Sequence, residues 1–261
     1  MKLELATDVI GVALPRLVRH LDLFSGIGGF ALAARMAGGI ETVGFCEIDP
    51  WARRILAKNF PNVPIHDDVK TLNPSDYGRI DLITGGYPCQ PFSTAGHKRG
   101  EADPRHLWPH MRRVIQEARP AWVLCENVDG HVRQGLDQVL QEMEADGYTV
   151  RPLLIPAAGV GARHRRNRVW ILAHCESVGR GQGDANQGRR DAGVQARQEP
   201  RSWDVLDSVW GEPLEAVFGG KAYGLPDRVD RLRGLGNAIV PQVAAEILRA
   251  MMEVNSLLPN K

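Results

Sequence analysis

One loop of the chain carries a thiol between two prolines, where it could act as a nucleophile. Residues 88–91 read PCQP, with Cys89 in the second place, and they follow a short apolar run at 80–84. Another apolar run, 121–125, is followed directly by Glu126. If the two runs are neighbouring parallel strands, a thiol and a carboxylic acid face one pocket, which suits covalent catalysis with the acid supplying a proton. Taken singly, the two residues are equally compatible with an ordinary exposed thiol and a structural carboxylate.

A glycine-rich segment follows the first apolar run. Residues 22–30 read DLFSGIGGF, so three glycines stand between a strand-like run and a helix-like one. Glycines let a ligand approach the backbone, and the N-terminus of a helix favours a carboxylate or phosphate. The spacing is G-x-G-G, not the G-x-G-x-x-G of dinucleotide sites. The segment predicts a cofactor loop, and a plain tight turn is the alternative.

Carboxylates follow the next apolar segments. Glu47 ends the second run, in the sequence Glu-Ile-Asp, and a carboxylate in that place suits ribose hydroxyls. Asp67 and Asp68 come further along the chain, where a third acidic contact could reach an adenine amino group. The ordinary interpretation of Glu47 is a charge at a helix N-terminus.

The elements that must position these residues form a regular series. We expect strands at 18–24, 42–46, 80–84, 121–125, 148–155 and 169–173, and helices at 29–37, 50–59, 105–118, 134–146 and 240–254. Short apolar strands separated by helices predict an α/β fold with a mainly parallel sheet and helices on both faces. Ligands bind at the carboxyl ends of the strands in such a sheet, and the candidate residues all fall there.

The composition is that of one ordinary globular domain. The chain has 261 residues, with 32 Lys plus Arg against 31 Asp plus Glu, so the net charge of +1 gives no sign of a nucleic-acid partner for the molecule as a whole. No apolar run approaches a membrane span, and Glu4 and Asp8 interrupt the N-terminus, so we expect neither a membrane helix nor a signal peptide.

The four cysteines show neither CxxC pairing nor the spacing of metal ligands. They predict a reducing cytosol and no bound metal. Three of them, Cys46, Cys125 and Cys175, end apolar runs and are expected to be buried as small hydrophobic residues.

The motifs and their order resemble those of the DNA (cytosine-5) methyltransferase family. The segments that carry the resemblance are 22–30 for the cofactor motif, 47–49 and 68–69 for the next two, 88–90 for the nucleophile motif, 126–128 for the acid motif, 166–168 for the basic motif and 236–241 for the closing motif. The resemblance implies a Rossmann-like methyltransferase fold. It also implies a catalytic domain made of residues 1–174 and 228–261, with a short, partly flexible target-recognition region at 175–227.

The resemblance implies particular roles for the site residues. Cys89 is expected to add to C6 of a flipped-out cytosine, Glu126 to hold N3 and the amino group, Arg168 to contact O2 and lean on Glu126, and Arg166 to contact phosphate or support the loop. The methyl donor is expected to be S-adenosylmethionine, with S-adenosylhomocysteine as product. The expected cofactor-binding residues are Phe24, Gly26, Ile27, Gly28, Glu47, Ile48, Asp68, Val69, Pro88, Leu107, Asn237 and Ala238.

Positive charge for DNA is local. Residues 161–201 hold nine arginines against four acidic residues, and phosphate contacts supply most of the non-specific affinity for DNA. Such arginines are also typical of a solvated face. We expect double-stranded DNA as the partner, together with a cognate restriction endonuclease, and a cytoplasmic monomer encoded by a bacterium or phage.

Three alternatives differ in substrate or in class. The first is an RNA (tRNA) cytosine-5 methyltransferase with the same chemistry. The second is a catalytically weak DNA-binding remnant of the family, which the presence of Cys89, Glu126 and Arg168 disfavours. The third is a nicotinamide oxidoreductase on a similar sheet, which the G-x-G-G and Pro-Cys-Gln segments disfavour.

Overall fold

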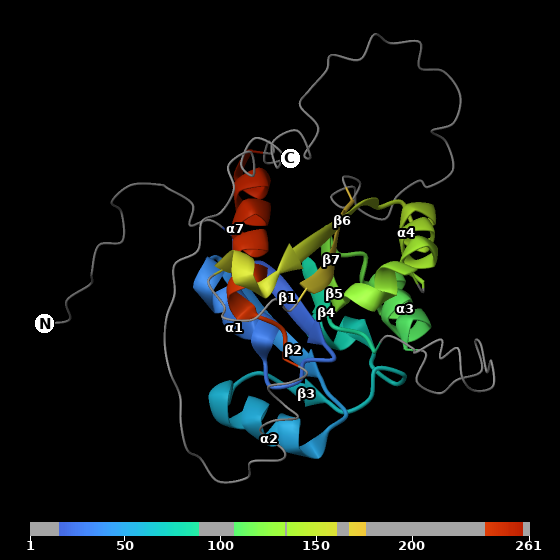
Figure 1. Cartoon of the computed structure of the whole chain (residues 1–261). Helices are drawn as coiled ribbons and strands as arrows, with labels where there is room; N and C mark the ends of the chain where they lie inside the picture. Colours follow the sequence, from blue (N-terminus) through green and yellow to red (C-terminus); the bar gives the residue numbers. More distant parts are fainter. Residues whose placement is uncertain (1–15, 89–106, 134, 161–166, 176–237, 258–261) are drawn as a thin grey trace, which may run out of the picture.

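A seven-stranded sheet forms the centre of the protein (Figure 1), in a computed structural model that describes residues 16–88, 107–133, 135–160, 167–175 and 238–257. Its strands are β1 (Val18–Leu23), β2 (Ile40–Cys46), β3 (Ile65–His66), β4 (Leu82–Gly85), β5 (Trp122–Val128), β6 (Thr149–Pro156) and β7 (Asn167–His174). They lie in the order β3-β2-β1-β4-β5-β7-β6. The strands from β3 to β5 pair in parallel, and β7 runs antiparallel to its neighbours β5 and β6.

The direction in which the sheet is built changes at β1. From β1 the chain continues outward through β2 to β3, and then crosses to the other side of β1 to form β4 and β5. β1 and β4 pair from His20↔Leu82 to Leu23↔Gly85. A switch of this kind leaves a crevice beyond the carboxyl ends of the two strands, and ligands of open α/β sheets bind there.

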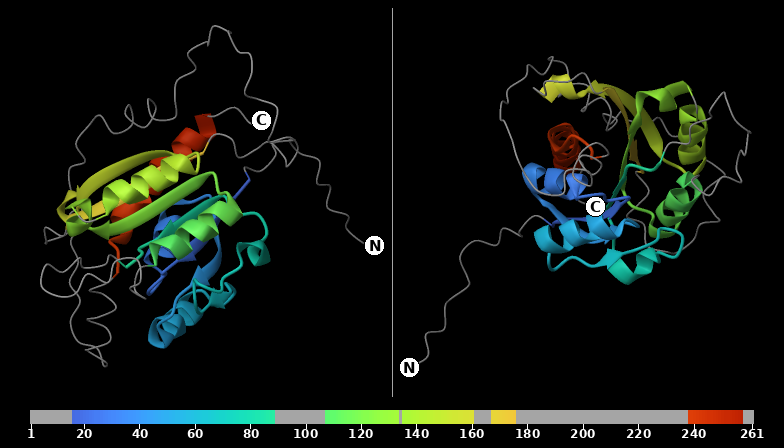
Figure 2. Two further views of the ribbon diagram at one scale, coloured as in Figure 1. Left: turned by 90° about the vertical axis from the view of Figure 1, so that its right-hand side faces the viewer. Right: turned by 60° about the horizontal axis from the view of Figure 1, so that its bottom comes forward.

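Helices cover both faces of the sheet (Figure 2). They are α1 (Gly29–Ala37), α2 (Pro50–Asn59), α3 (Trp108–Ala118), α4 (Leu136–Ala145) and α7 (Pro241–Leu257), with short 3-10 turns η1 (Pro74–Tyr77), η3 (Asp129–Arg133) and η4 (Ala157–Val160). Met111 of α3 and Met143 of α4 share one buried cluster with Ile83 of the sheet. On the opposite face α1 and α7 lie side by side, and Leu248 of α7 shares a second cluster with Trp170. Full burial of such a side chain stabilises the fold by roughly 1.5–3 kcal/mol.

Local sequence explains where the first two helices begin. Gly28 precedes α1 with φ 90°, a left-handed conformation that glycine adopts without a steric penalty. Asp49 caps α2, because its side chain accepts hydrogen bonds from the amides of Trp51 and Ala52, and Pro50 occupies the first turn. Both helices follow a strand end directly, so their N-termini lie at the carboxyl edge of the sheet.

The predicted mainly parallel sheet with helices on both faces is confirmed, and helices 29–37 and 50–59 have the predicted bounds. Several bounds differ: β2 begins at Ile40 rather than 42, and β7 covers Asn167–His174 rather than 169–173. β3 was not predicted, because its two residues are too few to show a pattern. The strand predicted at 121–125 continues to Val128, because β7 pairs with it as far as Arg168. The helix predicted at 105–118 begins at Trp108, with Leu107 as its capping position.

Burial agrees with the prediction for three cysteines. Cys46, Cys125 and Cys175 are all buried, and the amide of Cys175 donates to the carbonyl of Ala121, the residue just before β5. Cys175 therefore packs with the sheet, and residues 176–227 of the predicted target-recognition region lie outside the described residues. None of the helices that the structure describes is long and apolar enough to cross a membrane.

Candidate functional site

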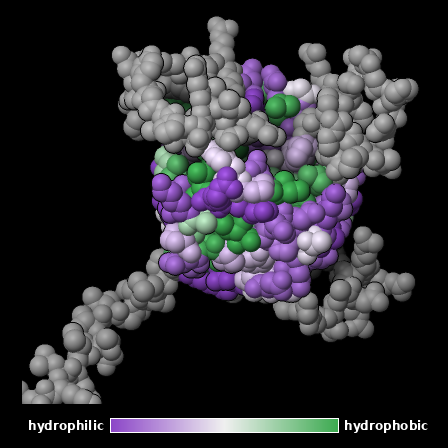
Figure 3. All heavy atoms as spheres, turned by 90° about the horizontal axis from the view of Figure 1, so that it is seen from below, coloured by the Kyte–Doolittle hydropathy of each residue, from purple (hydrophilic) through white to green (hydrophobic). Residues whose placement is uncertain are grey.

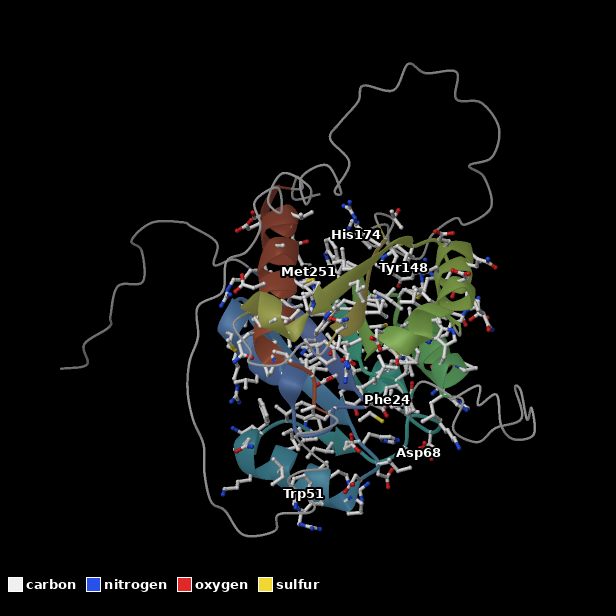
Figure 4. The ribbon with its side chains drawn as sticks, viewed as in Figure 1. Phe24, Trp51, Asp68, Tyr148, His174 and Met251 are labelled. Atoms are coloured by element: carbon white, nitrogen blue, oxygen red, sulfur yellow. The ribbon has the colours of Figure 1, made fainter. Side chains whose placement is uncertain are left out.

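The predicted site residues that the structure describes gather mainly at one edge of the sheet. Phe24 follows β1, Glu47 follows β2, Asp68 follows β3, and Glu126 lies near the end of β5. Figure 4 shows Phe24 and Asp68 toward one end of the sheet, with Tyr148 and His174 toward the other. The strand order therefore places at one edge residues as far apart along the chain as Phe24 and Glu126.

The glycine loop turns sharply after β1. Phe24 has φ 53°, Gly26 has φ 54° and Gly28 has φ 90°. A phenylalanine in this region stores roughly 1 kcal/mol or more of backbone strain, which structures tolerate mainly at functional sites. The loop is held by Ser25, whose hydroxyl donates to the carbonyl of Asp22 at 2.6 Å and whose amide donates to the carbonyl of Cys46 at 3.1 Å.

The two glycines differ in what surrounds them. A Cβ on Gly26 would meet no heavy atom within 4 Å, whereas a Cβ on Gly28 would lie 2.8 Å from Cε2 of Phe60. Gly28 is therefore needed so that α2 and its following residue can pack against the loop. Gly26 presents an open stretch of backbone, as a cofactor loop requires.

Glu47 braces this loop. Its Oε2 accepts a hydrogen bond from the amide of Gly26 at 2.6 Å, and its Oε1 accepts one from the amide of Asp49 at 2.8 Å. Asp49, and not Glu47, caps α2, so Glu47 contacts the N-terminus of that helix only through the amide of Asp49. Each carboxylate oxygen has two lone pairs, so acceptor capacity remains for the hydroxyls of a ligand.

Three neighbouring residues of the predicted cofactor set have different surroundings. Ile48 is 69% exposed, the most exposed of the large apolar side chains that the structure describes. Asp68 accepts a hydrogen bond from the amide of Lys70 at 2.9 Å and is half-buried. The side chain of Val69 is buried in the main core, so any contact from Val69 to a ligand would come from its main chain.

The surface at this end of the molecule is mixed in character. Figure 3 views the protein from the side where α2 lies, and apolar side chains form patches there among polar ones. Exposed apolar atoms beside hydrogen-bonding groups suit a ligand with a flat ring and a polar edge.

Glu126 and Arg168 form an ion pair at the end of β5. Nε of Arg168 lies 2.8 Å from Oε1 of Glu126, and the two side chains are 18% and 10% exposed. Arg168 stands opposite Val128 in β7, and Glu126 stands opposite Trp170, so the pair is a diagonal one across two antiparallel strands. The guanidinium also donates to the carbonyl of Asn167. The pairing fixes the orientation of a carboxylate that is largely removed from water.

The backbone after β4 passes close to this carboxylate. A Cβ on Gly86 would lie 3.6 Å from Oε2 of Glu126. Gly86 and Tyr87 lead to Pro88, which is exposed and directly precedes Cys89. Cys89, Arg166 and Asn237, all predicted site residues, lie outside the described residues.

Burial makes two of the described thiols, those of Cys46 and Cys125, poor nucleophiles. It raises the pKa of Cys46 to about 12 and raises the pKa of Cys125 further still. Since the thiolate is the nucleophilic form, neither of these cysteines is suited to nucleophilic catalysis. Among the described residues, no group of three His, Cys, Asp or Glu side chains is arranged to hold a metal.

The remaining predicted cofactor residues lie at the margins of the same region. Ile27 is half-buried in the glycine loop, and Leu107 is half-buried at the start of α3. Ala238 is half-buried just before α7, and the next residue, Ile239, touches the glycine loop. A Cβ on Gly29 would lie 2.7 Å from Cγ1 of Ile239. Ile239 therefore packs directly on the start of α1.

A buried polar chain runs beneath the glycine loop and was not predicted. The ring of His20 contacts the hydroxyl of Thr42 at 3.0 Å and that of Thr84 at 2.7 Å, and Thr84 donates to Oδ1 of Asp22 at 3.0 Å. Burial lowers the pKa of His20 to about 3 and raises the pKa of Asp22 to about 8. The sequence signal that could have revealed this chain is the presence of His20, Asp22 and Thr84 within predicted strands, because buried polar side chains need hydrogen-bond partners.

A second group that sequence reasoning missed surrounds Tyr87. Its hydroxyl lies 2.8 Å from Nε2 of His131, and its carbonyl accepts a hydrogen bond from Asn127 at 3.0 Å. Both partners follow Glu126 closely in the chain. Nothing in the residue spacing pointed to His131, because η3 is too short to show a periodic pattern.

Comparisons with known proteins show the family to which the chain belongs. The family model for C-5 cytosine-specific DNA methylase matches residues 18–202, so the chain belongs to that family. The Type II methyltransferase M2.BsuMI of Bacillus subtilis is 36% identical over 168 residues, which is 60% of this chain and 42% of the relative. The Type II methyltransferase M.HgiCII of Herpetosiphon aurantiacus is 36% identical over 169 residues, 62% of this chain and 38% of the relative. The chain thus spans less than half the length of these two curated relatives.

Solved structures show the same fold. The Dnmt2 methyltransferase of S. pombe superposes with a TM-score of 0.53 and 26% identity, covering 60% of this chain and 51% of that one. The Entamoeba histolytica methyltransferase EhMeth has a TM-score of 0.59 over 91% of this chain and 98% of that one, and its 14% identity supports the fold alone.

Proposed function

We propose that this chain is a DNA (cytosine-5) methyltransferase, which moves a methyl group from S-adenosylmethionine to C5 of a cytosine. The observation that carries the proposal is the Glu126–Arg168 ion pair, which lies against Gly86 on the path from β4 to Cys89. The family membership and the Type II methyltransferase names of the relatives support the same chemistry.

The reaction needs a nucleophile because C5 of cytosine is itself a poor one. The Cys89 thiolate forms a bond to C6 of the ring, which makes C5 electron-rich, and Glu126 supplies a proton to N3 as that bond forms. Since Arg168 donates to Oε1 of Glu126, we assign the proton for N3 to Oε2. After methyl transfer N3 returns its proton to Glu126, a water molecule takes the proton from C5, and the bond between C6 and sulfur breaks to release the Cys89 thiolate, which restores the aromatic ring.

The carboxyl edge of β1 to β3 offers groups that fit the methyl donor. S-adenosylmethionine, when bound, supplies an electrophilic methyl group on a sulfonium. Glu47 would accept from the ribose hydroxyls, the exposed side chain of Ile48 would pack on the adenine, and Asp68 would meet the adenine amino group. Phe24, Gly26, Ile27 and Gly28 would form the wall nearest the amino-acid part, with Val69, Pro88, Leu107, Asn237 and Ala238 as the other contacts.

Double-stranded DNA is the substrate that we propose. The target atom lies inside the duplex, so the cytosine must be flipped out to reach Cys89. The arginines of 161–201 would supply phosphate contacts, and Arg166 would be one of them. Residues 176–227 would read the sequence. We also propose that the protein is a monomer in the cytoplasm, encoded by a bacterium or phage. Its proposed partner is a cognate restriction endonuclease.

The test is a tritiated methyl-transfer assay on the full chain. Unmethylated duplex DNA should accept label at cytosine C5, and unmodified tRNA should not. Cys89→Ala should bind S-adenosylmethionine with unchanged affinity but transfer no label. Label on tRNA alone would move the substrate to RNA, and cofactor binding without transfer to either substrate would refute the catalytic proposal.

A further inference from the structure

Tyr87 belongs to the segment that connects β4 to the proposed nucleophile, Cys89. It stands two residues before Cys89, and it is only 3% exposed. Gly85, two residues earlier, ends β4 opposite Cys125 of β5. The chain therefore leaves the sheet beside Glu126 and passes through Tyr87 on its way to Cys89.

Two hydrogen bonds hold Tyr87 to the segment that follows Glu126. The side-chain amide of Asn127 donates to the carbonyl of Tyr87 at 3.0 Å, and the hydroxyl of Tyr87 lies 2.8 Å from Nε2 of His131. One bond restrains the main chain and the other restrains the ring. Together the two hydrogen bonds fix the direction in which the chain leaves Tyr87. Neither the main chain nor the ring of Tyr87 can rotate without breaking a buried hydrogen bond.

The side chains packed around the Tyr87 ring hold it in one rotamer, in which its hydroxyl reaches His131. The ring packs against the indole of Trp108 with centroids 5.1 Å apart and against the His131 imidazole at 5.5 Å. His131 is itself only 4% exposed, and burial lowers its pKa, so its ring is neutral near pH 7. A neutral imidazole with its proton on Nδ1 accepts at Nε2, and the tyrosine hydroxyl then donates to it.

We propose that the Tyr87–His131 hydrogen bond is a positioning contact that sets Cys89 against Glu126. The inference rests on the proposed function, in which the Cys89 thiolate and Glu126 must reach the same cytosine ring. Tyr87 and His131 are positioning residues and touch no substrate. A displacement of about 1 Å in such a pair lowers a rate about a hundredfold, so loss of the hydroxyl alone should be measurable.

The chain contains a matched control. Tyr148 is also 3% exposed, and its hydroxyl donates to the carbonyl of Pro120 at 2.9 Å. Pro120 precedes β5, and Tyr148 precedes β6, so this bond lies at the opposite end of the sheet from Glu126 (Figure 4). Tyr148→Phe removes a similarly buried tyrosine hydrogen bond without touching the proposed site.

The experiment compares single-turnover methyl transfer to duplex DNA by full-length variants. Tyr87→Phe and His131→Leu should each lower the rate about tenfold or more. The double variant should be no slower than the slower single one. His131→Gln, which keeps an acceptor at the Nε2 position, should stay near the wild-type rate. Tyr148→Phe should transfer at the wild-type rate even if its melting temperature falls.

Two further measurements separate positioning from folding and from the proposed function. The affinity for S-adenosylmethionine should not change in Tyr87→Phe, which would show that the variant is folded. The rate at which iodoacetamide alkylates Cys89, read by peptide mass spectrometry, should change several-fold in Tyr87→Phe and remain constant in Tyr148→Phe. Because alkylation needs no DNA, it decides the inference even if the wild-type chain transfers no methyl group, which would refute only the proposed function. If Tyr87→Phe transferred methyl groups, or if its Cys89 were alkylated, at the same rate as in the wild type, the positioning role would be overturned.

Discussion

Arg168 reaches Glu126 diagonally across two strands. Its Nε lies 2.8 Å from Oε1 of Glu126, although the residue opposite Arg168 in β5 is Val128. The contact depends on β5 continuing past Cys125, because Glu126 and Arg168 then project from the same face of the sheet. The pairing of β5 with β7 beyond Cys125, as far as Val128 and Arg168, thus joins the acid and basic motifs.

Removal of Arg168 should damage both stability and catalysis. In Arg168→Ala the buried carboxylate of Glu126 loses its charged partner, which should lower the free energy of unfolding by about 2–3 kcal/mol. Methyl transfer should fall about a hundredfold or more, since the acid is no longer oriented. Urea unfolding and single-turnover assays measure the two effects.

A surface ion pair serves as the control for Arg168. Arg249 pairs with Glu246 one turn away on α7, and both side chains are 40% exposed. Arg249→Ala should change stability by less than about 1 kcal/mol and leave transfer unchanged. An Arg168→Ala protein as stable and active as Arg249→Ala would show that the buried pair has no role.

Glu47 should matter for cofactor affinity more than for folding. Glu47→Gln places an amide group against the backbone amides of Gly26 and Asp49, so one of the two bracing hydrogen bonds is lost. We expect the affinity for S-adenosylmethionine to fall about tenfold, as measured by calorimetry. Asp49→Ala removes the cap of α2 and should lower stability by about 1 kcal/mol with little change in affinity. Equal affinity losses in both variants would mean that loop order alone, and no specific carboxylate, determines binding.

The two loop glycines should respond differently to alanine. Gly28→Ala brings a Cβ to 2.8 Å from Phe60 at φ 90°, and should lower the free energy of unfolding by about 2–4 kcal/mol. Gly26→Ala adds strain at φ 54° but no collision, so it should lower stability by about 1 kcal/mol. Its added methyl group points into the open space before the loop, where it should weaken cofactor binding. Thermal unfolding and cofactor titration distinguish the two, and equal stability losses would contradict the difference in packing.

Asp22 should make the fold less stable at high pH. Burial raises the pKa of this carboxyl from 3.8 to about 8, a hydrogen bond from Thr84 opposes the shift, and the charge of Glu47 adds to it. The folded chain keeps a proton that the unfolded chain loses, so the contribution to stability is complete below about pH 4 and is lost as the pH rises through about 8.

Asp22→Asn should remove that dependence, because the amide stays neutral and can still accept from Thr84. It should be more stable than the wild type by about 1 kcal/mol or more at about pH 9, and the advantage should vanish at about pH 4. Urea titrations at both pH values measure it. His20 supplies a control of opposite sign: burial lowers its pKa from 6.5 to about 3, so its contribution is lost as the pH falls. A pH-independent difference between Asp22→Asn and wild type would contradict the buried, protonated carboxyl.

The sequence predicts the sheet and its binding edge well because both follow from local signals. The apolar runs around Leu23, Thr84 and Cys125 are long enough to identify as strands, and Pro50 and the glycines mark the helix starts. Burial of the cysteines at 46, 125 and 175 follows from the same runs. The end of β5 could not be placed, because Glu126 and Asn127 are polar and only pairing with β7 keeps them in the strand.

Residue spacing could not predict contacts between side chains remote in sequence; the one that was predicted and is confirmed, Arg168 with Glu126, came from the family resemblance. His131 is one histidine in a short turn, and its partner Tyr87 lies 44 positions earlier. The same holds for Asp22 and Thr84, which are 62 positions apart and meet only because β1 and β4 are neighbours. Spacing along the chain carries no information about such pairs until the strand order is known. The role of Val69 also depended on packing, since its side chain belongs to the core.

The central claim is that Cys89 attacks the cytosine ring, and trapping tests it most directly. Duplex DNA containing 5-fluorocytosine keeps the enzyme attached after methyl transfer, because fluorine cannot leave C5 as a proton does. With S-adenosylmethionine present, the full chain should form a denaturant-resistant complex whose cross-linked peptide contains Cys89, and Cys89→Ala should form none. A complex that persists in Cys89→Ala, or methyl transfer to ordinary DNA without any trapped complex, would contradict the covalent mechanism.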